Sequence, residues 1–191
     1  MALMRSVRRQ MPVFAMFLRG VNVGRGNRVP MADLRIILSD LGYSNVSTLL
    51  NSGNAVFTSK QRSTSGHALR IHGAIAAKLF VDVPVVVKSR DELDAIVSDN
   101  SLARPDIDFS RLLVILAQSA TAISVLSQLE PLIRPPERFL RRSGAGYLYC
   151  ANGILESKAG KVLLGRAVAS VTTRNWSTVL KLKERAHAAA A

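Results

Sequence analysis

The stretch PVFAMFLRG, residues 12–20, decides the fold of the first part of the chain. Its apolar run, Val13 to Leu18, is bounded by Pro12 and Gly20, and a run this short predicts a central strand rather than a helix. The loop that follows, Arg19 to Val29, contains three glycines and is longer than the usual connection between a strand and a helix. Loops of this kind frequently carry functional residues.

After this strand, the sequence shows the apolar patterns of helices and strands in turn. Apolar spacing and turn residues predict a helix over residues 30–41, strands over 46–50 and 55–58, a helix over 68–79 and a strand over 84–88. The Asn-Ser-Gly-Asn segment at residues 51–54 consists of strong turn formers and predicts a β-hairpin. The resulting β-α-β-β-α-β order favours the ferredoxin-like arrangement, in which two helices pack on one face of a four-stranded antiparallel sheet.

The second half begins this order again. A capping box of Ser89 and Glu92 predicts a short helix through Val97, and the loop over residues 100–108 is the expected domain boundary. Beyond it, the patterns predict a strand over residues 112–117, a helix over 120–129, a hairpin of 139–142 with 147–150, a helix over about 160–168 and a last helix from Arg174 onward. We therefore expect an α+β fold of two ferredoxin-like subdomains in tandem, antiparallel sheets with helices on one face. The first spans residues 12–98, and the second, over residues 109–191, begins the same element order again and ends in a C-terminal helix.

The first residues predict a different kind of segment. Residues 1–11 carry three arginines and no acid, and they lack the apolar stretch of a signal peptide, so we expect a disordered basic leader. Alternatively, Met11 is the true start, because the first strand pattern begins directly after it.

Composition favours a cytoplasmic protein with anionic partners. The single cysteine, Cys150, excludes an internal disulfide and fits a reducing compartment, and no apolar run reaches the roughly 18 residues that cross a bilayer. The 26 lysines and arginines outnumber the 13 acids, which gives a net charge of +13. A polyanion or a phosphorylated ligand is the natural partner class, although a solvated basic surface accounts for the same charge equally well. The oligomeric state stays open.

Four polar clusters interrupt the apolar patterning. They are RGVNVG at residues 19–24, NSGN at 51–54, SK at 157–158 and TTRNW at 172–176. With the RVPM segment at residues 28–31, they resemble the signature of the bacterial family called domain of unknown function 1697, commonly spelled L-R-G-I-N-V-G, N-K-V-P-M, S-G-N and T-T-R-N-W. The resemblance spans residues 12–182 and implies a pair of ferredoxin-like subdomains without an established activity. Arg28 stands where the family often has lysine, and Ala159-Gly160 where a longer residue and threonine are usual.

The first polar cluster is a candidate phosphate site. Its loop leaves a strand, contains glycines together with Arg19 and Asn22, and enters a helix, a topology that presents backbone amides to phosphate. No G-K-[S/T] follows, and the glycine spacing does not match G-x-G-x-x-G, so no nucleotide motif is present. Glycines that serve only a tight turn are the simpler alternative.

The second and last clusters supply further candidates. Asn51, Ser52 and Asn54 either complete the hairpin turn or add uncharged hydrogen bonds beside the arginine loop. Thr173 is a candidate cap of the last helix, which would place Arg174 and Asn175 in its first turn. The field of the helix favours an anion there and disfavours a structural arginine.

The remaining candidates are weighed against structural roles. Lys158 is either a phosphate contact or a solvated lysine, and adjacent side chains point apart too far for Ser157 and Lys158 to act as nucleophile and base. Trp176 lies on the apolar face of the last helix, which favours a core anchor over a stacking platform. No cluster of His, Cys, Asp and Glu has metal-ligand spacing, so neither a metal nor a cofactor is expected.

Three functions stay open. The leading hypothesis is a binding module for a phosphate-bearing or polyanionic ligand, a nucleotide or RNA, and its candidate site residues are Arg19, Asn22, Asn51, Ser52, Asn54, Lys158, Arg174 and Asn175. For RNA, the strands offer Phe14, Phe17 and Phe57 as aromatic residues. The alternatives are an enzyme acting on a small phosphorylated substrate and a structural or oligomerising protein whose clusters brace its two halves. Ligand-binding clusters should line one exposed concave site, whereas bracing clusters should be buried and hydrogen-bonded to one another.

Overall fold

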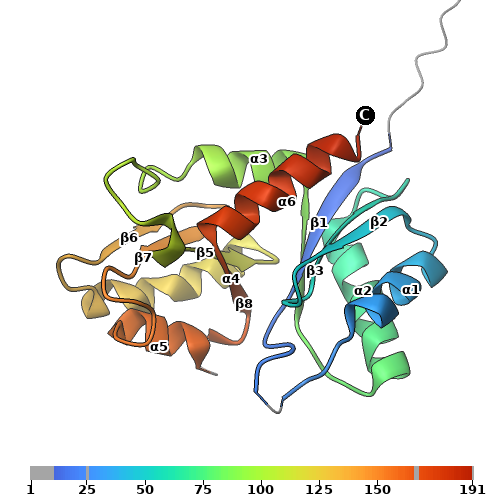
Figure 1. Cartoon of the computed structure of the whole chain (residues 1–191), viewed down its shortest axis with the longest axis horizontal. Helices are drawn as coiled ribbons and strands as arrows, with labels where there is room; N and C mark the ends of the chain where they lie inside the picture. The colour runs from blue at the N-terminus through green and yellow to red at the C-terminus, as the bar shows by residue number, and fades with distance from the viewer. Residues whose placement is uncertain (1–10, 25, 166–167, 191) are drawn as a thin grey trace, which may run out of the picture.

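The structure, a computed structural model, describes residues 11–24, 26–165 and 168–190, and residues 1–10 of the expected basic leader lie outside these ranges. The described residues form two four-stranded antiparallel sheets with helices packed against them (Figure 1). The predicted α+β class is therefore confirmed. None of the helices in these ranges is long and apolar enough to cross a membrane.

The first sheet lies within residues 13–89. Its elements are β1 (Val13–Leu18), α1 (Met31–Asp40), β2 (Ser44–Leu49), β3 (Asn54–Thr58), α2 (Thr64–Leu79) and β4 (Val85–Ser89). The strands lie in the order β2-β3-β1-β4, and each neighbouring pair is antiparallel. The hairpin predicted around residues 51–54 joins β2 to β3, as expected.

The second sheet lies within residues 112–175. Its elements are the 3-10 helix η1 (Phe109–Arg111), β5 (Leu112–Ala117), α4 (Ala120–Ser124), the 3-10 helix η2 (Val125–Leu132), β6 (Arg138–Arg141), β7 (Gly146–Tyr149), α5 (Lys158–Leu164) and β8 (Val171–Asn175). The strand order is β6-β7-β5-β8, so β5 takes the place that β1 takes in the first sheet. Two more helices, α3 (Arg90–Ser98) and α6 (Trp176–Ala188), follow the first and the second sheet.

Helices cover both faces of each sheet, and the expectation of helices on one face only is wrong. Phe14 and Leu18 of β1 pack in a cluster with α1 and α2, whereas Phe17 packs with α3 and α6. In the same way, Ile115 of β5 packs with α4 and α5, and Val114 packs with α3 and α6. The physical reason is that β1 and β5 are apolar at every position, so both of their faces must be shielded from water.

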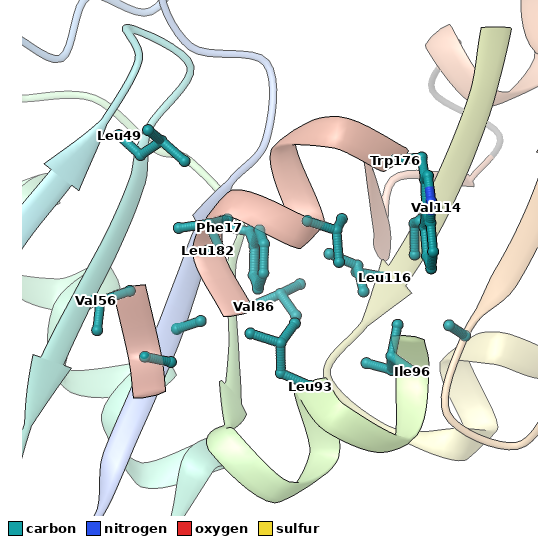
Figure 2. Close-up of a cluster of buried hydrophobic side chains, with 14 of the residues drawn as sticks. Phe17, Leu49, Val56, Val86, Leu93, Ile96, Val114, Leu116, Trp176 and Leu182 are labelled. Atoms are coloured by element: carbon teal, nitrogen blue, oxygen red, sulfur yellow. The ribbon is translucent and has the colours of Figure 1, made fainter. Parts of the chain in front are cut away.

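A shared apolar core therefore joins the two sheets. Its members come from both sheets and from the two helices between them: Phe17, Val86, Leu93, Ile96, Val114, Leu116, Trp176 and Leu182 (Figure 2). Trp176 is only 4% exposed, which agrees with its interpretation as a core anchor. Because α6 contacts strands of both sheets, it fixes the position of one sheet relative to the other.

The last helix begins later than predicted, and a strand precedes it. Thr173 and Arg174 belong to β8, which pairs with β5, and α6 begins at Trp176 with Asn175 as the preceding cap residue. The predicted cap at Thr173 is wrong. The β-branched run Val171-Thr172-Thr173 favours a strand, and the pairing with β5 outweighs the capping signal.

Two other predicted helices are shorter than expected. The helix predicted over residues 120–129 is divided into α4 and the 3-10 helix η2. The one predicted over residues 160–168 begins at Lys158 and ends at Leu164, and residues 166–167 lie outside the described ranges. Ser157 caps its first turn, because the Ser157 hydroxyl accepts a hydrogen bond from the Gly160 amide at 2.9 Å.

His67 of α2 is buried against the face of the first sheet that α1 and α2 cover. His67 lies among the rings of Phe14, Tyr43 and Phe57 at centroid distances of 4.5–5.4 Å. Its Nδ1 is 2.9 Å from the Tyr43 hydroxyl, and its Nε2 is 3.1 Å from the carbonyl oxygen of Gln61. Nε2 therefore donates to Gln61, and the Tyr43 hydroxyl donates to Nδ1 of a neutral ring. Burial lowers the pKa of His67 from its usual value of 6.5.

We expect the free energy of unfolding to decrease as the pH falls through about 6.5, the usual pKa of histidine, toward the lowered pKa of His67. Between the usual and the lowered pKa, the unfolded chain binds a proton at His67 that the folded chain does not, with a slope of at most about 1.4 kcal/mol per pH unit. Urea unfolding across this range measures the slope. His67→Phe should lose most of it, so an unchanged slope in His67→Phe would contradict the prediction.

Candidate functional site

A hollow of about 420 Å³ opens where the two sheets meet. It is lined by the loop after β1, the β2–β3 turn, the end of α5, strand β8 and the start of α6, and these segments come together in the lower centre of Figure 1. Its size lies within the range of small-ligand pockets. Four of the predicted site residues line it: Arg19, Ser52, Arg174 and Asn175.

Arg174 of β8 lies at the buried end of the hollow, which is called its floor below, and bonds to the first sheet. Its side chain is only 9% exposed. All five of its N–H groups donate hydrogen bonds of 2.5–2.9 Å, to the side-chain oxygens of Asn54 and Thr172 and to the carbonyl oxygens of Leu18, Ser52 and Thr173. Three of these five acceptors belong to the first sheet and its hairpin, so Arg174 braces one sheet against the other.

The positive charge of Arg174 has no carboxylate partner among the described residues. Carbonyl and hydroxyl dipoles surround it, and the Phe17 ring lies 5.8 Å from the guanidinium carbon. Burial lowers the pKa of Arg174 to about 10, and the side chain remains a cation at neutral pH. The floor of the hollow therefore carries a fixed positive charge that only neutral dipoles compensate.

Arg19 reaches in the opposite direction, from the first half of the chain to the second. Its Nη1 donates to the carbonyl of Val171, and its Nη2 donates to the carbonyls of Leu163, at 3.3 Å, and Gly165, at 2.7 Å. Partial burial lowers the pKa of Arg19. Three of the five guanidinium N–H groups are used in this way, and the other two have no partner within the described part of the chain. Arg19 therefore retains donors for a ligand, which Arg174 does not.

The two predicted asparagines Asn22 and Asn54 hold the backbone rather than line the hollow. Asn22 donates to the carbonyls of Val29 and Asn51 at 2.8 and 2.7 Å and accepts from the Val29 amide at 2.9 Å. Asn54 is fully buried, donates to the Leu49 carbonyl at 3.0 Å and accepts from Arg174. Both side chains are buried or partly buried and bonded to neighbours, which is the pattern expected of braces.

The remaining predicted residues are divided between the hollow and other places. Ser52 and Asn175 line the hollow, and Asn175 also donates to the Ser110 carbonyl at 3.2 Å. Asn51 is exposed on the hairpin turn beside it. Lys158 lines a separate hollow of about 190 Å³ next to Pro135 and Pro136. The structure therefore does not bring Lys158 together with the two arginines.

Several residues of the hollow were not among the predicted site residues. They are the hydroxyl side chains Thr172, Thr173 and Thr178 and the apolar side chains Val21, Val23, Leu50, Leu163 and Leu164. Thr172 and Thr173 belong to the TTRNW cluster, which had drawn attention in the sequence. The apolar residues gave no such signal, because exposed and buried leucines look alike in a sequence.

Base stacking on the phenylalanines of the strands gains no support from the geometry. Phe14, Phe17 and Phe57 are at most 1% exposed, so none of them is available to stack on a base. In the described ranges, no three His, Cys, Asp or Glu side chains are grouped to hold a metal ion. Cys150 is buried, and its pKa is raised to about 11 by burial, which leaves the thiol protonated and unreactive at neutral pH.

The fold and the hollow define an α+β protein of two antiparallel sheets joined through a shared core and two cross-linking arginines. The family model for "Protein of unknown function (DUF1697)" matches residues 11–147, and the chain belongs to this family. The family expected from the sequence is thereby confirmed, and the clusters at residues 157–158 and 172–176 lie outside the matched range. Among curated proteins nothing matches.

A solved structure has the same fold. It is that of "conserved bacterial protein SP0830 from Streptococcus pneumoniae", which is 24% identical, with a TM-score of 0.76. The match covers 92% of this chain and 98% of the streptococcal chain. At this identity the likeness extends to the arrangement of the sheets and helices.

Proposed function

We propose that the hollow between the two sheets binds a small anionic ligand, phosphate-bearing in the leading case. Arg19 contacts the ligand, and Arg174 supplies a fixed positive charge behind it. One observation carries the proposal: two arginines flank a single hollow that has no aspartate or glutamate among its described lining residues. Each half of the chain, over residues 12–98 and 109–191, is in this proposal a ferredoxin-like unit, which the repeated strand order supports.

Burying a charged side chain costs free energy. A guanidinium taken out of water is unfavourable unless a charge or several dipoles compensate it, and both arginines have lowered pKa values because of burial. Carbonyl oxygens supply partial compensation. An anion in the hollow would supply the rest, and it would gain charge-assisted hydrogen bonds from Arg19 and neutral ones from Ser52.

Binding without acid–base chemistry fits this lining better than catalysis does. The described lining residues include no His, Cys, Lys, Tyr, Asp or Glu. A general acid or base must lie within hydrogen-bond reach of the reacting group, and Lys158 lines a different hollow. We therefore retain the binding module as the proposed function. The bracing alternative accounts for Arg174, Asn22 and Asn54, whose bonds are already complete, but it does not use the two remaining donors of Arg19.

Replacing Arg19 by glutamine should weaken anion binding by about tenfold to a hundredfold. Hydrogen bonds to a charged group contribute about 1.5–3 kcal/mol, which corresponds to that range of affinity. Titration calorimetry with inorganic phosphate and phenyl phosphate measures the change. Arg142→Gln, at an exposed position of the β6–β7 turn, removes the same charge away from the hollow and should leave the affinity unchanged.

Comparing the two variants shows whether the anions bind at the hollow or anywhere on the basic surface. Equal weakening in Arg19→Gln and Arg142→Gln would mean that the anions bind only to the basic surface, and the proposal would then be wrong. Circular dichroism spectra of both variants should match that of the unchanged protein, because Arg19 is only partly buried and Arg142 is exposed.

A further inference from the structure

Exposed apolar side chains gather at the same hollow. Within the described residues, eight large apolar side chains are exposed, and three of them line this hollow. They are Val23, 73% exposed, Leu50, 56% exposed, and Leu164, 55% exposed. The three come from the loop after β1, the β2–β3 turn and the end of α5, so segments far apart in the sequence contribute to one apolar rim.

Leu50 occupies a backbone conformation that leucine rarely adopts. Its φ is +58°, in the left-handed region that glycine and asparagine favour. Holding a residue with a Cβ there costs on the order of 1–2 kcal/mol. Because more than half of the side chain is exposed, burial in the chain itself does not offset this cost. An apolar ligand group resting on Leu50 would give this exposed side chain a packing partner.

The apolar rim and the positive floor belong to one cavity. Arg19 and Arg174 line it together with Val23, Leu50 and Leu164. Inorganic phosphate would use only the charged part, and a sugar phosphate would place hydroxyl groups against apolar side chains, where they would lose hydrogen bonds to water. A ligand matched to the whole cavity has an anionic group at one end and an apolar group at the other.

Resting on the proposed function, we infer that the hollow takes an aryl or branched-alkyl anion, a phosphate or a carboxylate bonded directly to an apolar group. The anionic group lies against Arg19 over the charge of Arg174. The apolar group lies against Val23, Leu50 and Leu164. This arrangement leaves the hydrogen bonds of Arg174 intact, since the ligand takes only the donors that Arg19 has left.

Calorimetric titration with four probes tests the inference. The probes are inorganic phosphate, glucose 6-phosphate, phenyl phosphate and benzoate, with phenol as the uncharged reference. Phenyl phosphate should bind at least about tenfold more tightly than either inorganic phosphate or glucose 6-phosphate, since each group accommodated in an apolar pocket commonly changes affinity by that factor or more. Comparing phenyl phosphate with benzoate identifies which anionic group the floor prefers.

Two rim variants and one matched control locate the effect. Leu50→Asn places a residue that tolerates the left-handed region, and Leu164→Ser changes an exposed position, so both variants should fold. Each should weaken phenyl phosphate binding about fivefold to tenfold and leave inorganic phosphate unchanged. Leu69→Ser removes an apolar side chain that is even more exposed, at 73%, from α2 outside the hollow and should change neither affinity.

The possible outcomes separate the inference from the proposed function. Equal affinities for phenyl phosphate, glucose 6-phosphate and inorganic phosphate, all weakened by Arg19→Gln, would overturn the inference and leave the anion site standing. Binding of none of the anions would overturn both. Phenol binding as tightly as phenyl phosphate, with no effect of Arg19→Gln, would also overturn both, because the hollow would then be an apolar site that does not recognise charge.

Discussion

Replacing Arg174 by methionine should lower the free energy of unfolding by about 3–5 kcal/mol, as is typical when one partner of a buried charged network is removed. The apolar stem of methionine fills much of the same space, but it removes the guanidinium donor from five acceptors, of which the Leu18 carbonyl keeps a longer bond of 3.3 Å from the Thr172 hydroxyl. Those on Leu18 and Asn54 are the most deeply placed. Urea unfolding monitored by circular dichroism measures the loss, because a two-state transition reports the free energy of unfolding directly.

The control for this prediction is an arginine that makes a single exposed bond. Arg185 on α6 donates to the carbonyl of Thr48 at 2.8 Å, and Arg185→Met should cost less than about 1 kcal/mol. Arg174→Lys keeps the charge but has three donors on a flexible stem instead of a planar fork, so it should recover less than half of the loss. A loss below about 1 kcal/mol in Arg174→Met would show that Arg174 does not brace the two sheets.

The strands and helices of the first half could be predicted because their patterns are local. Val13 to Leu18 is a short apolar run between two chain breakers, and residues 51–54 contain only turn formers, so each pattern allows few structures. The position of α3 and α6 between the sheets is not local. It depends on how their apolar faces pack against β1, more than 70 residues away from either helix in the sequence, and no single window contains that information.

The candidate site was predictable to a similar extent. Arg19, Ser52, Arg174 and Asn175 stood in polar clusters that interrupt apolar patterns, and the structure places all four at one hollow. A brace and a ligand contact cannot be distinguished from the sequence alone. For Arg174 this distinction comes from five hydrogen bonds, three of them to residues at least 120 positions away along the chain.

Strand β8 explains why the hydrogen bonds of Arg174 could not be predicted from the sequence. With Thr173 as a helix cap, Arg174 would lie in the first turn of a helix and its side chain would be available to an anion. In the structure Arg174 pairs with Val114 in the second sheet, and its side chain extends toward the first sheet. The helix starts at Trp176, two residues later than predicted. This shift of two residues decides whether the Arg174 side chain is free for a ligand or occupied as a brace.

Adding one methyl group at the hairpin turn should destabilise the protein almost as much as removing Arg174. In Gly53→Ala, the new Cβ would lie 2.6 Å from the Leu18 Cβ and 2.8 Å from the Val21 Cγ2, and the φ of +71° adds strain. Overpacking of this kind costs about 1–3 kcal/mol and the left-handed conformation about 1–2 kcal/mol, so we expect a loss of roughly 2–5 kcal/mol.

A matched glycine separates the two causes. Gly42 has a φ of +81°, but a Cβ added there would meet no atom within 4 Å, so Gly42→Ala should lose only the conformational part, about 1–2 kcal/mol. The difference between the two variants in urea unfolding measures the close approach of the hairpin to β1. Equal losses would mean that Leu18 and Val21 move aside easily. The hairpin would then not be held rigidly against β1, and the floor of the hollow would be less fixed than the bonds of Arg174 to Leu18 and Ser52 imply.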